Sequence, residues 1–189
     1  TITKSAWSHS ALYIGRIHDI EDPTLRETLH KHYQGAPHER LIIESHIGQG
    51  TYIAPLSKYH NDHLRICRPT GISAKDAQTV ISYAISRIGK QYDVRQFIDL
   101  GRFLLKSRLI PKRMGSSLFT DKSNSAAYEI CSEMIANAFS SIDFPILPLI
   151  KKDDTDQKFE LIRRNTRMTT PSDFDYSPFF DIIKYPFFQ

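Results

Sequence analysis

Residues 7–15 read WSHSALYIG, a polar entrance followed by a short apolar run that ends at a glycine. Short runs rich in β-branched and aromatic residues, bounded by turn residues, are typical of β-strands. The sequence contains four such runs, at residues 10–15, 41–45 (LIIES), 51–54 and 64–67. We expect them to form one antiparallel sheet.

The alternation of side chains along the first run predicts where its polar residues point. In a regular strand, His9 would share a face with Ala11 and Tyr13, while Ser10 would lie on the opposite face. The segment HIGQGTY, residues 46–52, lies between two of the expected strands and indicates a hairpin turn. A phosphate-binding loop would need a following helix, which this segment lacks.

Three helical patterns follow the strands. The first begins with Ser73 as N-cap and Asp76 three residues later, and it ends at Gly89. The others cover about residues 95–106 and 131–141, and the stretch between these two has the composition of a long loop. The pattern predicts an α+β fold in a single domain over residues 1–189, with the aromatic segment of about 170–189 packing back on the body.

Three residues could carry chemistry. Cys131 begins the third helical pattern, where the helix dipole would favour a thiolate, although a lone cysteine there is more often a buried structural residue. His9 could act as its base or be an ordinary histidine of the core or the surface. Glu44 lies within the apolar run LIIES, where a carboxylate is costly to bury unless it is paired, and orienting an imidazole would pair it.

The order of WSHSALYIG, LIIES, IGKQYD and a helix beginning CSEMIANAF resembles the permuted papain-like hydrolases of the NlpC type, specifically the YiiX/YebB-like group. The resemblance runs from about Trp7 to the TPSDF segment near Thr170. It implies a small antiparallel sheet or half-barrel with the nucleophile helix packed against it.

The resemblance also assigns roles to residues. It makes Cys131 the nucleophile, His9 the base and Glu44 the orienting third member, while Tyr92 of IGKQYD would donate a hydrogen bond near the oxyanion. His46 shares the expected face of Glu44 and is the alternative third member. The sequence leaves open whether residues upstream of Thr1 complete the site.

The implied activity is that of a cysteine hydrolase of the amidase or peptidase type, working through an acyl-enzyme without a metal or other cofactor. Peptide-like amides, such as cell-wall peptides, are the expected substrates. The alternatives are an acyl hydrolase or acyltransferase of the same fold that acts on lipids or thioesters, and a non-catalytic binding module that retains the cleft.

The net charge is +4 and the charged residues are spread widely, with only the stretch RFLLKSRLIPKR concentrating basic ones. This stretch is either a solvated surface or a contact for an anionic surface such as phospholipid headgroups or cell-wall polymer. Its basic residues are Arg102, Lys106, Arg108, Lys112 and Arg113. No recognisable reading motif accompanies the charge, so we do not expect nucleic acid as a partner.

The remaining histidines and the second cysteine favour structural roles. The pairs His30 and His32, and His60 and His63, have spacings that could hold a metal ion, but we expect solvated loop histidines. Cys67 is expected to face the core or the sheet. No run of about 18 apolar residues occurs, which predicts a soluble protein. Localisation stays open, including whether a signal peptide precedes Thr1, and so does the oligomeric state.

Overall fold

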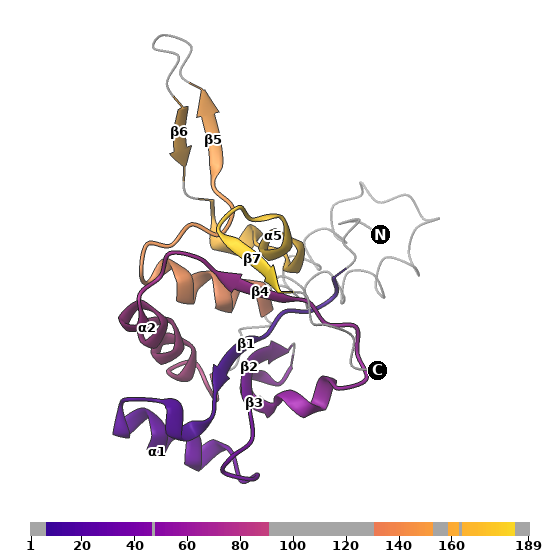
Figure 1. The fold of residues 1–189 in the computed structure, drawn as a ribbon, viewed down its shortest axis with the longest axis vertical. Helices are drawn as coiled ribbons and strands as arrows, with labels where there is room; N and C mark the ends of the chain where they lie inside the picture. The colour runs from indigo at the N-terminus through magenta and orange to yellow at the C-terminus, as the bar shows by residue number, and fades with distance from the viewer. Residues whose placement is uncertain (1–6, 47, 91–130, 153–158, 163, 184–189) are drawn as a thin grey trace, which may run out of the picture.

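The computed structural model describes residues 7–46, 48–90, 131–152, 159–162 and 164–183. Figure 1 shows an α+β arrangement in which the described strands form three small antiparallel sheets. The strands are β1 (Leu12–Gly15), β2 (Leu41–His46), β3 (Gly50–Pro55), β4 (Ile66–Pro69), β5 (Leu149–Lys152), β6 (Phe159–Ile162) and β7 (Phe180–Ile183). The α-helices are α1 (Pro23–His32), α2 (Ala74–Ile85) and α5 (Pro171–Tyr176), with an unlabelled helix over residues 131–140. Short 3₁₀ helices are η1 (Ile17–Asp19), η2 (Leu56–Tyr59) and η4 (Thr166–Met168).

The largest sheet has the order β1-β2-β3, with β2 in the centre. Leu12 pairs with Ile43 on one side of β2, and Glu44 pairs with Tyr52 on the other. The predicted hairpin turn between β2 and β3 is confirmed. Gly48 and Gly50 both have positive φ angles, near +79° and +78°, which side chains with a Cβ rarely adopt. The central strand is therefore held in one register, and its buried face is set by that register.

The prediction of one sheet is wrong for the fourth strand. β4 pairs with β7 in a separate two-stranded sheet, where Cys67 lies opposite Ile182. The pattern of residues 64–67 predicted a strand but not its partner, because alternation determines which face is buried and not which edge is used. β5 and β6 form a third sheet, a hairpin that extends away from the body in Figure 1.

The helices follow local signals. α2 begins with the predicted capping box, in which Ser73 and Asp76 exchange side-chain and backbone hydrogen bonds. α1 begins with Asp22 as N-cap and has a proline in its first turn, so His30 and His32 lie in its last turn and not in a loop as expected. The expected helix over residues 95–106 and the loop after it lie outside the described residues.

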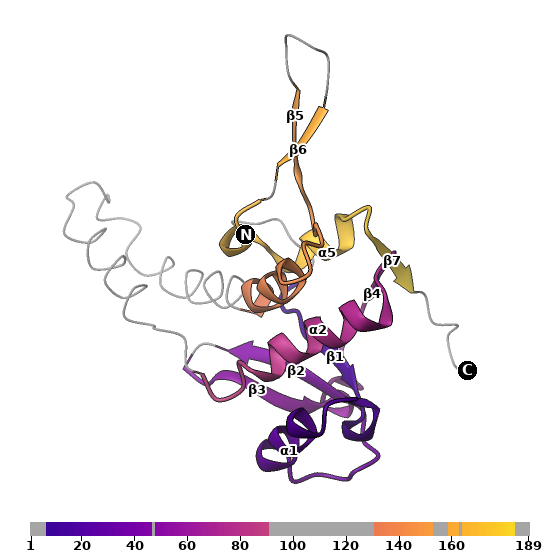
Figure 2. The same cartoon turned by 90° about the vertical axis from the view of Figure 1, so that its left-hand side faces the viewer.

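One core joins these elements. Its fully buried members come from α1 (Leu29), β2 (Ile43), α2 (Ala84) and the helix over residues 131–140 (Ala138), each 0% exposed. Figure 2 shows this last helix beside α2, which itself lies against β1. Because apolar burial holds that helix against the strands, it also holds Cys131 at a fixed depth in the protein. No helix in the described part of the chain is long and apolar enough to cross a membrane.

Candidate active site

Glu44 is at the centre of the site. It lies in the middle of β2, and its side chain is 0% exposed. Its carboxylate is 2.7 Å from His9 Nε2, accepts a hydrogen bond from Lys58 Nζ at 2.7 Å, and accepts another from the Tyr59 hydroxyl. Burial alone would raise the pKa of Glu44, but the hydrogen bonds from these three partners hold it well below its usual range. The carboxylate is therefore charged, and the paired carboxylate inferred from LIIES has three named partners.

His9 connects Glu44 to the thiol of Cys131. Burial lowers the pKa of His9, but hydrogen bonding and charge interactions with Cys131 and Glu44 outweigh it and raise the pKa to about 9. Burial likewise raises the pKa of Cys131, but hydrogen bonding and charge interaction with His9, together with hydrogen bonds from Ser10, leave it lowered. This arrangement favours the pair of imidazolium and thiolate over the neutral imidazole and thiol.

Ser10 also reaches Cys131, which the sequence did not predict. Its hydroxyl donates to Cys131 Sγ at 3.5 Å and lies 3.3 Å from Ser132 Oγ. Strict alternation had placed Ser10 and His9 on opposite faces, and this is wrong because β1 begins only at Leu12. The irregular backbone before the strand lets two consecutive side chains approach the same sulfur.

The segment that carries His9 is held by a second set of contacts. Trp7 Nε1 donates to Asp175 Oδ2 in α5 at 2.9 Å, and Arg65 binds both oxygens of the same carboxylate at 2.6 and 2.7 Å. The guanidinium of Arg65 also lies 4.8 Å above the Trp7 ring. These contacts hold Trp7, two residues before His9, against α5. They therefore limit how far the imidazole of His9 can move.

His46 lies beside this site at the end of β2. Its Nε2 is 3.4 Å from Glu44 Oε2, and its ring centroid is 4.6 Å from that of His9. Burial and the nearby charge of His9 lower the pKa of His46. His46 thus approaches the same carboxylate oxygen as His9, but His9 makes the shorter contact.

Several predicted residues stand apart from this site or cannot be placed. Tyr92 and the basic stretch over residues 102–113 lie outside the described residues, as does the chain immediately before Cys131. Cys67 packs against the core from β4, and it is a free thiol. Lys58 and Tyr59 were not identified as site residues from the sequence. They lie on the short 3₁₀ helix η2, and no periodicity in its sequence relates their side chains to Glu44 in β2.

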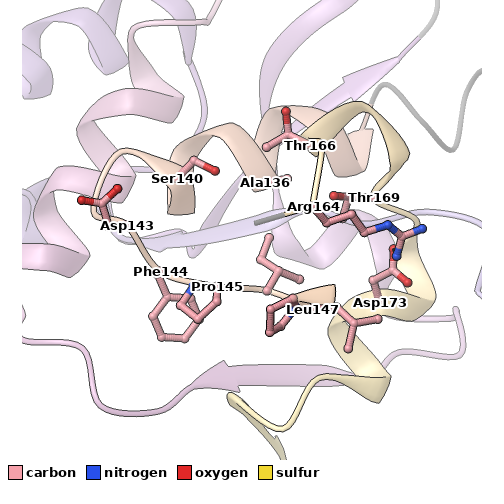
Figure 3. A pocket seen from close by; sticks show the side chains of 12 residues that line it. Ala136, Ser140, Asp143, Phe144, Pro145, Leu147, Arg164, Thr166, Thr169 and Asp173 are labelled. Atoms are coloured by element: carbon pink, nitrogen blue, oxygen red, sulfur yellow. The ribbon is translucent and has the colours of Figure 1, made fainter. Parts of the chain in front are cut away.

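A separate cavity of about 260 Å³ lies on another side of the helix over residues 131–140 (Figure 3). That helix lines it with Ala136 and Ser140, which at about 100° per residue are rotated by roughly 140° and 180° from Cys131. Arg164 and Asp173 form a 3.1 Å ion pair at its edge. The cavity is therefore distinct from the site around Cys131.

One protein-family model matches the chain, over residues 1–99, and it describes the permuted papain-like amidase enzymes of the YaeF/YiiX, C92 family. The chain belongs to this family. The family resemblance inferred from the four sequence segments is thus confirmed. The matched part contains His9 and Glu44 of this amidase-family chain, whereas Cys131 lies beyond it. No curated protein and no solved structure gave a significant match.

Proposed function

We propose that the protein is a cysteine hydrolase of the amidase type, with Cys131 as nucleophile, His9 as base and Glu44 as the residue that orients His9. The observation that carries the proposal is the position of the His9 ring. Its Nε2 is 2.7 Å from the buried carboxylate of Glu44, and its interaction with Cys131 lowers the pKa of the thiol. A nucleophile, a base and an orienting carboxylate in series are the requirements for thiol catalysis.

The reaction would proceed through an acyl-enzyme. The Cys131 thiolate attacks the amide carbonyl, and the oxyanion is held by the backbone N–H of Cys131 with help from Tyr92. His9 then gives its proton to the leaving amine as the C–N bond breaks. A water molecule, losing a proton to His9, attacks the thioester and releases the acid. Glu44 stabilises the imidazolium throughout, and this sequence of steps uses no metal or other cofactor.

Peptide-like amides, such as cell-wall peptides, are the substrates we propose, and the amidase character of the family supports this choice. The other candidates are lipid or thioester acyl groups and, with turnover lost, a binding module. The arrangement of Cys131, His9 and Glu44 speaks against the last, because a binding module has no need to keep all three groups together. We further propose that the nucleophile helix and the β1-β2-β3 sheet form the half-barrel of the permuted papain-like fold.

Thiol alkylation followed against pH tests the reactive residue. Iodoacetamide should modify Cys131 well below the pH at which it modifies Cys67, because burial raises the pKa of Cys67 while His9 lowers that of Cys131. Mass spectrometry of the labelled peptides separates the two thiols within one sample. Burial of Cys131 can slow its labelling at every pH, so the midpoints are compared, and equal pH midpoints for the two thiols would contradict an activated nucleophile.

Turnover assays then test the reaction. Amide, ester and thioester substrates with one common acyl group should show which leaving group the site prefers, and we expect the amide to be hydrolysed. Cys131→Ala should remove turnover of all three, since no other residue would form the acyl-enzyme. Cys67→Ala is the matched control and should retain the wild-type rate. A Cys131→Ala protein with the wild-type rate would end the cysteine-hydrolase proposal.

A further inference from the structure

Three ligand atoms of the kind that zinc prefers converge at the site. They are Nε2 of His9, Nε2 of His46 and a carboxylate oxygen of Glu44, and they lie within 4.8 Å of one another. Among the described residues, no other set of three or more histidine, cysteine or acidic side chains meets the same geometric condition. The histidine pairs in α1 and after η2 do not, in line with the expectation that their spacing, although compatible with a metal ion, does not form a metal site.

The distances suit one tetrahedral ion. With metal–ligand bonds of about 2.0–2.2 Å, tetrahedral zinc ligands lie roughly 3.3 Å apart. Glu44 Oε2 is already 2.7 Å from His9 Nε2 and 3.4 Å from His46 Nε2. The two imidazoles need only close from at most 4.8 Å, and a rotation of His46, whose side chain is 40% exposed, can supply this movement.

The contacts of Glu44 and the types of ligand atom both bear on which ion the three atoms could bind. Glu44 uses its other oxygen, Oε1, for Lys58, so Oε2 can bind a metal without breaking that ion pair. The hydrogen bonds to Oε2 from Tyr59 and from His9 are the contacts that must yield. A set of two imidazoles and one carboxylate suits Zn²⁺, whereas Mg²⁺ and Ca²⁺ prefer oxygen ligands alone.

We propose that His9, Glu44 and His46 form a reversible inhibitory site for one Zn²⁺ ion. The ion takes the place of the proton between His9 Nε2 and Glu44 Oε2, with water as its fourth ligand. His9 is then held by the metal and not by the carboxylate, and the two added positive charges oppose the imidazolium that hydrolysis requires. The inhibitory part of this inference rests on the proposed function, but the binding part does not.

Calorimetric titration of metal-free protein with ZnCl₂ tests the binding directly. We expect one Zn²⁺ per chain for the wild type, and affinity at least about tenfold weaker for His46→Gln, because one of three ligands is lost. His30→Gln removes an exposed histidine of α1 and is the matched control, with unchanged affinity. Cys131→Ser should also retain the site, since the thiol is not among the three ligands. MgCl₂ in place of ZnCl₂ should give no binding heat.

Inhibition provides the second readout. Zn²⁺ should reduce turnover of the wild type in the same concentration range as binding, EDTA should restore it, and His46→Gln should need at least about tenfold more Zn²⁺, relative to its own uninhibited rate. Stoichiometric binding by a protein that hydrolyses none of the substrates would overturn the proposed function and leave the metal site standing. Affinity that is unchanged in His46→Gln, or that is lost in Cys131→Ser, would overturn the metal site. Thermal melts of each variant exclude unfolding as the cause.

Discussion

Replacing Glu44 by glutamine tests the central contact of the site, because it removes the charge and keeps the size of the side chain. The carboxylate helps to raise the pKa of His9 from 6.5 to about 9, a role it shares with Cys131. At about 1.4 kcal/mol per pKa unit, the net rise corresponds to roughly 3 kcal/mol of imidazolium stabilisation. If Glu44 supplies half or more of it, the variant loses about 1.5–3 kcal/mol, in line with a hydrogen bond to a charged group.

This loss predicts both a rate and a pH profile. The value of kcat/KM for Glu44→Gln should fall by about 10- to 100-fold, less than for substitutions of Cys131 or His9. Imidazolium is the active form, so activity is present below the pKa of His9 and is lost as the pH rises through it. For the wild type the basic limb should lie near pH 9, and for Glu44→Gln it should move at least about one unit lower.

Lys58→Met is the matched control for this experiment. It removes the other charged partner of Glu44 but leaves the carboxylate with His9. A positive neighbour disfavours a second positive charge, so its loss should leave the basic limb unchanged or move it to higher pH. Only Glu44→Gln should therefore move the basic limb to lower pH, and each variant must first melt cooperatively. Wild-type kcat/KM and an unmoved limb in Glu44→Gln would refute the assigned role of the carboxylate.

Three further changes test the contacts around the site and the core beneath it. Ser10→Ala should raise the pKa of Cys131 and slow its alkylation at pH 6 by about tenfold, since a hydrogen bond to the sulfur is lost; an unchanged rate would mean that the hydroxyl does not stabilise the thiolate. Asp175→Asn weakens an ion pair and the hydrogen bond from Trp7, and should cost about 1 kcal/mol in urea unfolding, a difference that disappears at a pH low enough to protonate the carboxylate. Leu29→Ala leaves a cavity in the core and should cost about 3 kcal/mol by the same measurement, whereas a cost below 1 kcal/mol would place this part of α1 outside the core.

Local signals in the sequence were sufficient for the elements that they control. The capping box of Ser73 and Asp76 marked the start of α2, and the glycines of HIGQGTY marked the β2–β3 turn. Glu44 stood out because a carboxylate within an apolar run needs a partner, and the order of four short segments was sufficient to predict the family. The capping box, the turn and the position of Glu44 each depend on residues that are neighbours in the chain, whereas the family depends on the order of segments along it.

The tertiary structure decided which distant groups meet. Lys58 and Tyr59 approach Glu44 because η2 folds back beside β2, and no periodicity in the sequence reports such a turn. The pairing of β4 with β7 joins strands more than 100 residues apart, and a strand's own pattern does not name its partner. Ser10 contacts the sulfur only because the chain is irregular before Leu12. Side-chain type and spacing thus indicate which groups need partners, whereas packing of the whole chain determines which residues those partners are.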